Sequence, residues 1–300
     1  MQFFDLHCDT LYKAYTSNLT LNEPTFEISI DRGKAFSKWC ECTAVWIPDG
    51  LSAKEGMKLF LGCCEKLEKE ASEAQIDLSL VNEYSREHSF ILTVENASFL
   101  DNDISKVSLL KDKGVRMITL TWNDENCLGG GADKQGVGLK PFGKQCLEAF
   151  EKNSIVIDVS HASDKLFYDV CEHTVRPFAA SHSNSRKVCD HRRNITDEQF
   201  GIIKERGGVV GLNFHRDFLS IDSEKAGVCD VLRHTEHFLS LGGENTICIG
   251  SDFDGSDVPQ SLNGIEKIAD LYEEYLKIGY NEQLVQKILF DNAYNFFTKF

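Results

Sequence analysis

Metal-binding and proton-transferring side chains stand at the ends of short apolar runs of the chain. The first run ends in His7-Cys8-Asp9. Because alternate residues of a strand point to the same side, His7 and Asp9 would face one way and Cys8 the other, and Asp5 would join them if the strand is regular. An imidazole and a carboxylate at a strand end suit a divalent metal ion. The pair alone could equally be a buried histidine bonded to an aspartate.

Four later runs end in the same kind of residue. Glu95 closes SFILTVE and His161 follows SIVIDVS, while His182 closes RPFAASH and Asp252 closes TICIGSD. If these runs are parallel strands of one barrel, their carboxyl ends meet on one face, which is where the active sites of such barrels lie. Buried carboxylates without partners are costly, and divalent cations remove that cost.

The number of these groups indicates two metal ions. Three histidines and three carboxylates exceed the needs of one tetrahedral zinc that keeps an open position. They suit two ions about 3.5–4 Å apart that share a carboxylate. Glu95 is the expected bridge, because its strand lies between the strand of His7 and Asp9 and the later strands.

Eight strand-like runs, separated by amphipathic stretches, would position these groups. The runs are 2–7, 41–47, 89–95, 116–122, 154–160, 176–182, 208–214 and 246–252. The helix-like stretches are 53–72, 103–113, 142–152, 164–173, 196–206, 224–241, 262–278 and 281–298, and Ser163 and Thr196 are expected to cap two of them. Residues 11–40 have no clear pattern.

This rhythm predicts the α/β class and a (β/α)₈ TIM barrel that carries a binuclear metal site at its C-terminal face. We expect a single domain over residues 1–300. An open doubly wound sheet is the alternative, but it would usually carry a glycine-rich phosphate turn after its first strand. This chain has His7-Cys-Asp-Thr there.

Composition and charge exclude several classes of partner. The formal net charge is −15, which repels phosphate backbones and anionic lipid surfaces. No apolar stretch approaches the length of a membrane span, and the first residues do not resemble a signal peptide. The eleven cysteines include no spaced pairs of the kind that bind metals, so we expect reduced thiols and a cytoplasmic location.

The segment from Arg186 to Asn194 is the densest basic stretch of this acidic chain. One of its arginines would suit a substrate carboxylate, although a solvated loop explains the charges equally well. His173, His234 and His237 fall in helical stretches, and we expect them at the surface or at helix ends. His215, after the seventh strand, could line the pocket.

Eight motifs together resemble the membrane (renal) dipeptidase family, in its soluble bacterial form. They are DLHCD, TVEN, RMITLTWN, GLKPFG, IDVSHAS, SHSNSRKVCDHRRN, GGVVGLNF and IGSDFDG. The resemblance runs through most of the chain and is densest from Gly114 to Asp217. It implies a (β/α)₈ barrel that holds two zinc ions and usually forms a homodimer.

The resemblance also implies roles for single residues. The first zinc's ligands fall on His7 and Asp9, the bridging carboxylate on Glu95, and the second zinc's ligands on His161 and His182. The catalytic aspartate falls on Asp252 and the substrate-binding arginine on Arg193. Two substrate-binding positions depart from the family. Trp122 stands where many members have a histidine that helps to bind the reacting centre, and Phe218 stands where some have a tyrosine.

The expected function is therefore that of a zinc-dependent dipeptidase. A hydroxide shared by the two metals would attack the peptide carbonyl, and Asp252 would carry its proton to the leaving amine. The resemblance implies tolerance of a D-residue at the second position. The alternatives are a metal-dependent hydrolase of another amide, lactam, ester or phosphoester bond, and a catalytically silent metal-binding scaffold.

Overall fold

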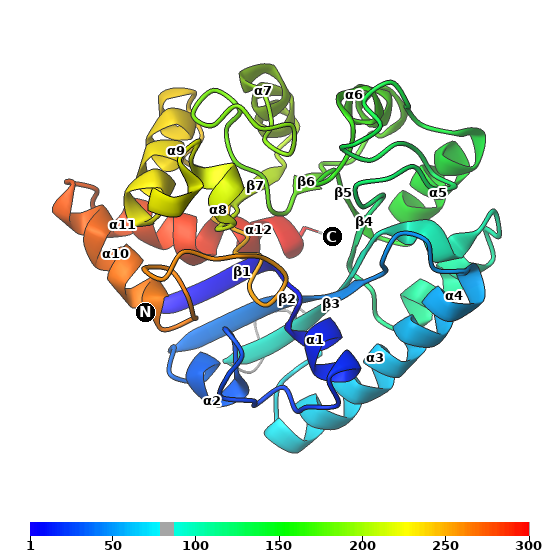
Figure 1. Ribbon diagram of the computed structural model, residues 1–300, viewed down its shortest axis with the longest axis horizontal. Coiled ribbons are helices and arrows are strands. Elements are labelled where there is room, and N and C mark those ends of the chain that lie inside the picture. The colour runs from blue at the N-terminus through cyan, green and yellow to red at the C-terminus, as the bar shows by residue number, and fades with distance from the viewer. Residues whose placement is uncertain (79–86, 300) are drawn as a thin grey trace.

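Eight parallel strands follow one another in chain order around a closed barrel. They appear in the computed structural model of Figure 1, which describes residues 1–78 and 87–299. Their bounds are β1 Gln2–Cys8, β2 Lys38–Trp46, β3 His88–Glu95, β4 Met117–Thr119, β5 Val156–Asp158, β6 Ala179–Ala180, β7 Val209–Leu212 and β8 Ile247–Ile249. The predicted barrel is confirmed, and the open doubly wound sheet is wrong.

Helices surround the barrel, as Figure 1 shows. Between the strands lie α1 Thr10–Thr16, α2 Ile30–Gly33, α3 Ala53–Ala74, α4 Lys106–Asp112, α5 Pro141–Lys152, α6 Asp164–His173, α7 Asp197–Glu205, α8 Arg216–Leu219 and α9 Val228–Ser240. After β8 come α10 Lys267–Lys277, α11 Glu282–Gln286 and α12 Asn292–Phe297. η1 Ala97–Leu100 and η2 Ser223–Lys225 are 3₁₀ turns, and η3 Lys287–Asp291 is a π-helical segment. The expected helix over 281–298 is thus three successive segments.

The helix starts follow from local side-chain chemistry. The Ser163 hydroxyl accepts a hydrogen bond from the Leu166 amide at the start of α6. Thr196 and Gln199 bond reciprocally at the start of α7 and form a capping box. Both satisfy amides that have no partner within the helix. The two predicted caps are confirmed.

The end of the barrel opposite the site is apolar and closed. Phe4 stacks on Phe297 of α12, with ring centroids 5.6 Å apart, and also contacts Phe290 of η3. Cys42 and Met117 belong to the same buried cluster. Because the C-terminal segments fill this end, the opposite end of the barrel is the one left for a site.

An irregularity in β1 separates Asp5 from His7. The pairing of β1 with β2 shifts register between Asp5 and Cys8. The Asp5 carboxylate accepts hydrogen bonds from the His7 amide (3.2 Å), the Ser251 amide (2.8 Å) and the Ser251 hydroxyl (2.5 Å). In a regular strand Asp5 would face the same side as His7 and Asp9. Here Asp5 instead ties β1 to the chain after β8 and does not join these groups.

Among residues 1–78 and 87–299, no helix combines the length and the apolar character needed to cross a lipid bilayer.

His234 is fully buried in α9, so its expected place at the surface or at a helix end is wrong. Its Nδ1 accepts a hydrogen bond from the Ser185 amide (3.1 Å), and its Nε2–H donates to the Leu219 carbonyl (3.0 Å). The neutral ring thereby joins the segment after β6 to α8. Burial is the main cause that lowers the pKa of His234 to about 4. The Leu219 carbonyl and Asp230 act in the opposite direction, and Arg233 and His237 lower the pKa slightly further.

This histidine predicts a loss of stability in acid. The unfolded chain takes up a proton near pH 6.5, whereas folded His234 stays neutral down to about pH 4. The free energy of unfolding should therefore fall between these pH values by up to about 3 kcal/mol, at about 1.4 kcal/mol per pKa unit. Urea unfolding of metal-free protein at pH 7 and pH 4.5 measures it. His234→Gln should lose less stability on acidification than the wild type, whereas His173→Gln, at an exposed site, should match the wild type. An equal loss in all three proteins would contradict this role.

Candidate metal centre

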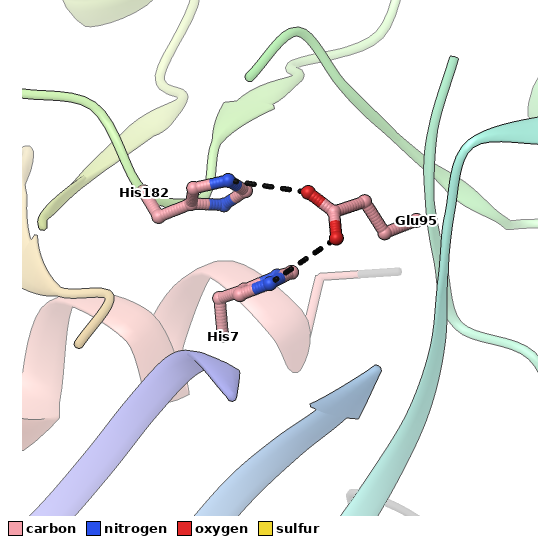
Figure 2. Close-up of side chains that lie close together, drawn as sticks. All are labelled: His7, Glu95 and His182. Carbon is pink, nitrogen blue, oxygen red and sulfur yellow. Dashed lines mark ion pairs between the residues drawn. The ribbon is translucent and has the colours of Figure 1, made fainter. Parts of the chain in front are cut away.

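Glu95, the last residue of β3, lies between three histidine rings. One carboxylate oxygen, Oε2, is 3.8 Å from His7 Nε2. The other, Oε1, is 2.8 Å from His161 Nε2 and 3.5 Å from His182 Nε2. Figure 2 shows the His7 and His182 rings on the same side of the carboxylate, one above the other, each facing a different oxygen. The two oxygens thus serve two separate sets of histidines, which is the arrangement that a bridging carboxylate needs.

Hydrogen bonds at Nδ1 orient two of these rings. His161 donates from Nδ1–H to Asn123 Oδ1 at 2.8 Å. The Ser181 hydroxyl donates to Asp158 Oδ2 at 2.6 Å, so it accepts from Nδ1–H of His182 at 2.7 Å. A neutral ring with its proton on Nδ1 has a lone pair on Nε2. Both rings therefore present a ligand atom to Glu95, and their partners fix the tautomer that metal binding requires.

A second group of ligand atoms lies on the other side of His7. His7 Nε2 is 3.5 Å from Asp9 Oδ2 and 3.9 Å from Asp252 Oδ1. The second Asp252 oxygen accepts a hydrogen bond from Asn213 Nδ2 at 3.0 Å. The structure therefore brings Asp252 beside the two residues predicted to hold the first metal, and ligand atoms of His7, Asp9 and Asp252 lie within 4.8 Å of one another.

The backbone around the centre is strained and closely packed. His161 and Asp252 have φ values of 65° and 64°, in the left-handed region that residues other than glycine rarely adopt. Gly255 passes so close that a Cβ there would lie 1.9 Å from Asp9 Oδ2 and 3.1 Å from Asp252 Oδ1. Only glycine allows the loop after β8 to cover these carboxylates.

The buried charges are unbalanced in the protein alone. Burial raises the pKa of Glu95 well above its usual range, and Asp9 and Asp252 add to that effect. Burial alone would lower the pKa of His7, but Glu95 and Asp9 outweigh it and raise that pKa to about 10. Burial lowers the pKa of His161 and of His182 well below the usual value. The buried carboxylates thus favour a cation nearby, and the neutral rings of His161 and His182 can bind one.

These residues fit divalent metal ions. His7 Nε2, His182 Nε2 and Asp9 Oδ1 are buried and have no hydrogen-bond partner. Buried polar atoms without partners are costly and call for a missing ligand. Imidazole nitrogens together with carboxylate oxygens are the donor set that zinc takes in catalytic sites. The convergent groups are His7, Glu95 and His182 on one side and His7, Asp9 and Asp252 on the other.

A cavity of about 290 Å³ opens over this centre. Trp122 and Phe218 line it, and so does His215. Its volume is at the small end of the range of about 300–1,000 Å³ for ligand sites, as a small substrate requires. Of the predicted substrate-binding residues, these two aromatic side chains therefore lie where a ligand would contact them.

Arg193 lies beside the cavity, not on its wall. Its side chain is 5% exposed, and its guanidinium carbon is 5.3 Å from the centre of the Phe218 ring. Its Nε and Nη2 have no hydrogen-bond partner. Burial lowers its pKa to about 10, against the attraction of Asp252 and Glu95. The other arginines of this segment pair outward, Arg186 with Asp164 at 2.8 Å and Arg192 with Asp133 at 2.6 Å.

Asp254 joins the loop after β8 to the loop after β1. Its buried carboxylate accepts hydrogen bonds from the Thr10 hydroxyl (2.7 Å), Lys13 Nζ (2.8 Å) and the Glu27 amide (2.9 Å). Thr10 directly follows Asp9, and Asp254 comes two residues after Asp252. This carboxylate thus fixes the distance between two loops that each supply an acid to the centre.

Several residues of the site were not predicted from the sequence. Asn123, Ser181 and Asn213 hold His161, His182 and Asp252 in place. Each stands at or just after the end of an apolar run, which is the signal that singled out the predicted ligands, but an amide or hydroxyl at a strand end is too common to single out. Tyr12 and Trp46 also line the cavity.

Comparison with known proteins agrees with this geometry. Dipeptidase 3 of Rattus norvegicus is 31% identical over 217 residues, which span 70% of this chain but only 44% of the rat protein. The structure of dipeptidase AC, a metallopeptidase of family M19, superposes with a TM-score of 0.92 at 26% identity and covers 99% of this chain and 98% of its own.

A second solved structure is a metallopeptidase from Rhodobacter sphaeroides, liganded with a phosphinate mimic of the dipeptide L-Ala-D-Ala. It has a TM-score of 0.92 at 25% identity, with 99% of both chains covered. The sequence also matches the membrane dipeptidase family, peptidase family M19, over residues 1–299. Together with the barrel and its buried cluster of histidines and carboxylates, this match shows that the chain belongs to the membrane dipeptidase family.

Proposed function

We propose that the protein hydrolyses dipeptides with two zinc ions, one held by His7 and Asp9, the other by His161 and His182, and both by Glu95. The coarser part follows from the family: the protein is a metal-dependent dipeptidase. The observation that carries the finer part is the position of Glu95, whose Oε2 faces His7 and whose Oε1 faces His161 and His182.

When bound, such ions lower the pKa of a water molecule and polarise the carbonyl that it attacks. The chain itself supplies the proton transfer. Asn213 holds one oxygen of Asp252, so the other stays directed toward His7 and the reaction centre. In our proposal Asp252 accepts the proton of the attacking water and delivers it to the leaving amine, as a general base and then a general acid.

Arg193 supplies the positive charge for the substrate. Two of its nitrogens are buried without partners, which is a state that a carboxylate oxygen or a developing oxyanion would relieve. Phe218 lines the cavity next to this arginine and would contact the substrate's C-terminal residue. Trp122 would contact the substrate from the opposite side. We propose that this arrangement accepts a D-residue in the C-terminal position, as the ligand of the Rhodobacter sphaeroides structure suggests.

The cavity favours an amide substrate over a phosphoester. Four carboxylates line it and no lysine or arginine does, among the residues that the structure describes: Asp9, Glu95, Asp252 and Asp254. Beyond the metal ions, a phosphate group would meet only one nearby cation, the buried Arg193. A carboxylate oxygen of this set that the metals leave free would suit a substrate that carries a free amino group.

A substrate panel tests this function. We expect purified, zinc-loaded protein to release amino acids from L,L- and L,D-dipeptides, to leave N-acetylated dipeptides and tripeptides largely intact, and to leave phosphoesters untouched. Chelation should abolish the release and zinc should restore it. Hydrolysis of phosphoesters or lactones in place of every dipeptide would contradict the proposal.

We also propose a cytoplasmic homodimer. All eleven cysteines are free. Ten of them are buried or half-buried, at sites such as Cys8, Cys63 and Cys248, and Cys229 is exposed. Unpaired thiols in this number suit a reducing compartment. Sedimentation velocity of the purified protein measures the oligomeric state, and a monomer at micromolar concentration would contradict the dimer.

A further inference from the structure

One wall of the cavity consists of three aromatic rings in contact with one another. The Tyr12 ring, on α1, meets the Trp46 ring at the end of β2, with centroids 5.0 Å apart and planes at 74°. Trp46 meets Trp122, which follows β4, at 5.1 Å and 60°. Edge-to-face contacts of this kind are the preferred geometry of aromatic pairs. All three side chains line the cavity, and we call them the aromatic wall.

The aromatic wall stands across the barrel from the arginine. In the closed order of eight strands, β6 is opposite β2 and β7 is opposite β3. Arg193 lies in the segment after β6, and Phe218 lies after β7. The aromatic wall belongs to β2, to β4 and to α1, which follows β1 (Figure 1). A ligand over Glu95 at the end of β3 therefore lies between two different walls.

We propose that the aromatic wall binds the side chain of the substrate's N-terminal residue, and that the enzyme selects dipeptides in which this side chain is apolar or aromatic. The inference rests on the proposed function and takes the first of the two roles given there to Arg193, in which it holds the free carboxylate of the C-terminal residue. With the carboxylate on the side of β6 and the peptide carbonyl over the metal centre, the N-terminal residue must extend toward β2 and β4.

The chemistry of the aromatic wall sets the class of side chain. Trp46 and Trp122 hold each other in place, so an apolar side chain gains contact area without first ordering them. An acidic side chain would find no lysine or arginine among the described residues that line the cavity. One nearby carboxylate, that of Asp254, is already bonded to Lys13 and Thr10. One extra methylene in a hydrophobic pocket is worth about 10- to 200-fold in selectivity.

Two substrate series separate this pocket from the rest of the cavity. The first varies the N-terminal residue of Xaa-Ala through Ala, Leu, Phe, Asp and Lys, and the second varies the C-terminal residue of Ala-Xaa in the same way. In the wild type we expect kcat/KM to rise about 10-fold or more from Ala-Ala to Leu-Ala and Phe-Ala, and to fall for Asp-Ala. The second series should show a smaller range for apolar residues.

Variants assign the preference to the aromatic wall. Trp122→Ala should reduce the ratio of kcat/KM for Leu-Ala over Ala-Ala by about 10-fold, whereas Trp122→Phe should keep most of it. Phe218→Ala, on the opposite wall, is the matched control and should preserve this ratio. An unchanged ratio in Trp122→Ala, an equal rate for Ala and Leu in the first series, or a preference for Lys-Ala would each overturn the inference.

Fluorescence gives a readout that does not depend on turnover. The chain has three tryptophans; Trp46 and Trp122 are in the aromatic wall, and Trp39 is fully buried elsewhere. Asp252→Asn lacks the proposed proton carrier and should turn over slowly enough for binding to be followed. Titration of this variant with Phe-Ala should change the emission saturably and at lower concentration than Ala-Phe does. Equal responses to the two peptides would overturn the inference. If zinc-loaded wild type hydrolyses no dipeptide, the proposed function fails, and this titration still decides whether the aromatic wall binds apolar side chains.

Discussion

Replacing Glu95 with glutamine should remove metal-dependent activity while leaving the fold intact. Each metal position loses an anionic oxygen, because the amide offers one neutral oxygen and one NH₂ group in place of Oε2 and Oε1. Metal ions contribute several kcal/mol to transition-state stabilisation, and each 1.4 kcal/mol is a factor of ten. We therefore expect kcat/KM to fall by about 10³-fold or more, with at most one zinc retained per chain in metal analysis.

The stability of this variant should change in the opposite direction. Without metal, Glu95 is buried at 3% exposure, and burial is the largest cause that raises its pKa; attraction to His7 opposes this rise, and Asp9 and Asp252 add to it. Glutamine removes the cost of the buried carboxyl, which exceeds the lost attraction to His7, so metal-free Glu95→Gln should be at least as stable as metal-free wild type. Zinc should then stabilise the wild type by about 2.7 kcal/mol at 100 times its Kd, and the variant by much less. Chemical unfolding with and without zinc measures both effects.

The matched control is Glu41→Gln, the same change on the neighbouring strand β2. Glu41 is 1% exposed, and its Oε2 accepts a hydrogen bond from Trp39 Nε1 at 3.0 Å. Burial raises the pKa of its carboxyl well above the usual range, with Asp5 adding to the effect. Glutamine therefore replaces a neutral acid there, and we expect this variant to keep both metals and its activity. Full activity in Glu95→Gln would contradict the bridging role.

The second large effect is that of Asp252→Asn, which should keep both metals and lose most of its turnover. An amide can accept the Asn213 hydrogen bond that Asp252 now accepts, but it cannot carry a proton between water and amine. General acid–base catalysis is worth about 10²- to 10⁴-fold, so kcat should fall by that factor while KM changes little. Steady-state kinetics together with metal analysis of the same sample provide the measurement.

Asp257→Asn is the control for this change. Its carboxylate is exposed and pairs with Arg216 at 2.9 Å, outside the centre, so this variant should behave as wild type. Two results would revise the role of Asp252. Unchanged turnover would exclude it from proton transfer, and loss of one metal would make it a ligand, since its Oδ1 converges with His7 and Asp9.

The sequence predicts the barrel and the ligand groups for one reason. A parallel strand that is buried on both faces is a continuous apolar run, so a histidine or carboxylate at its end stands out. Glu95, His161 and His182 were recognisable in this way, and the structure brings them together. Their convergence depends only on the order of the strands, because the carboxyl ends of a closed parallel barrel share one face.

Other features depend on contacts between distant parts of the chain. The register shift in β1 separates Asp5 from His7, and a strict alternation of side chains cannot reveal it. Burial of His234 follows from the packing of α9 against α8 and the segment after β6, where Leu219 and Ser185 bond to it. The aromatic wall joins Trp46 and Trp122, which are 76 positions apart in the sequence and come together only when β2 and β4 stand on either side of β3.

The most direct test of the two-metal centre is a zinc titration of chelator-stripped wild type, with dipeptide hydrolysis recorded at each step. We predict no activity without metal and a rise that reaches its plateau at two zinc ions per chain, the number that the two oxygens of Glu95 imply. A plateau at one zinc ion, or full activity in the stripped protein, would contradict the proposed centre.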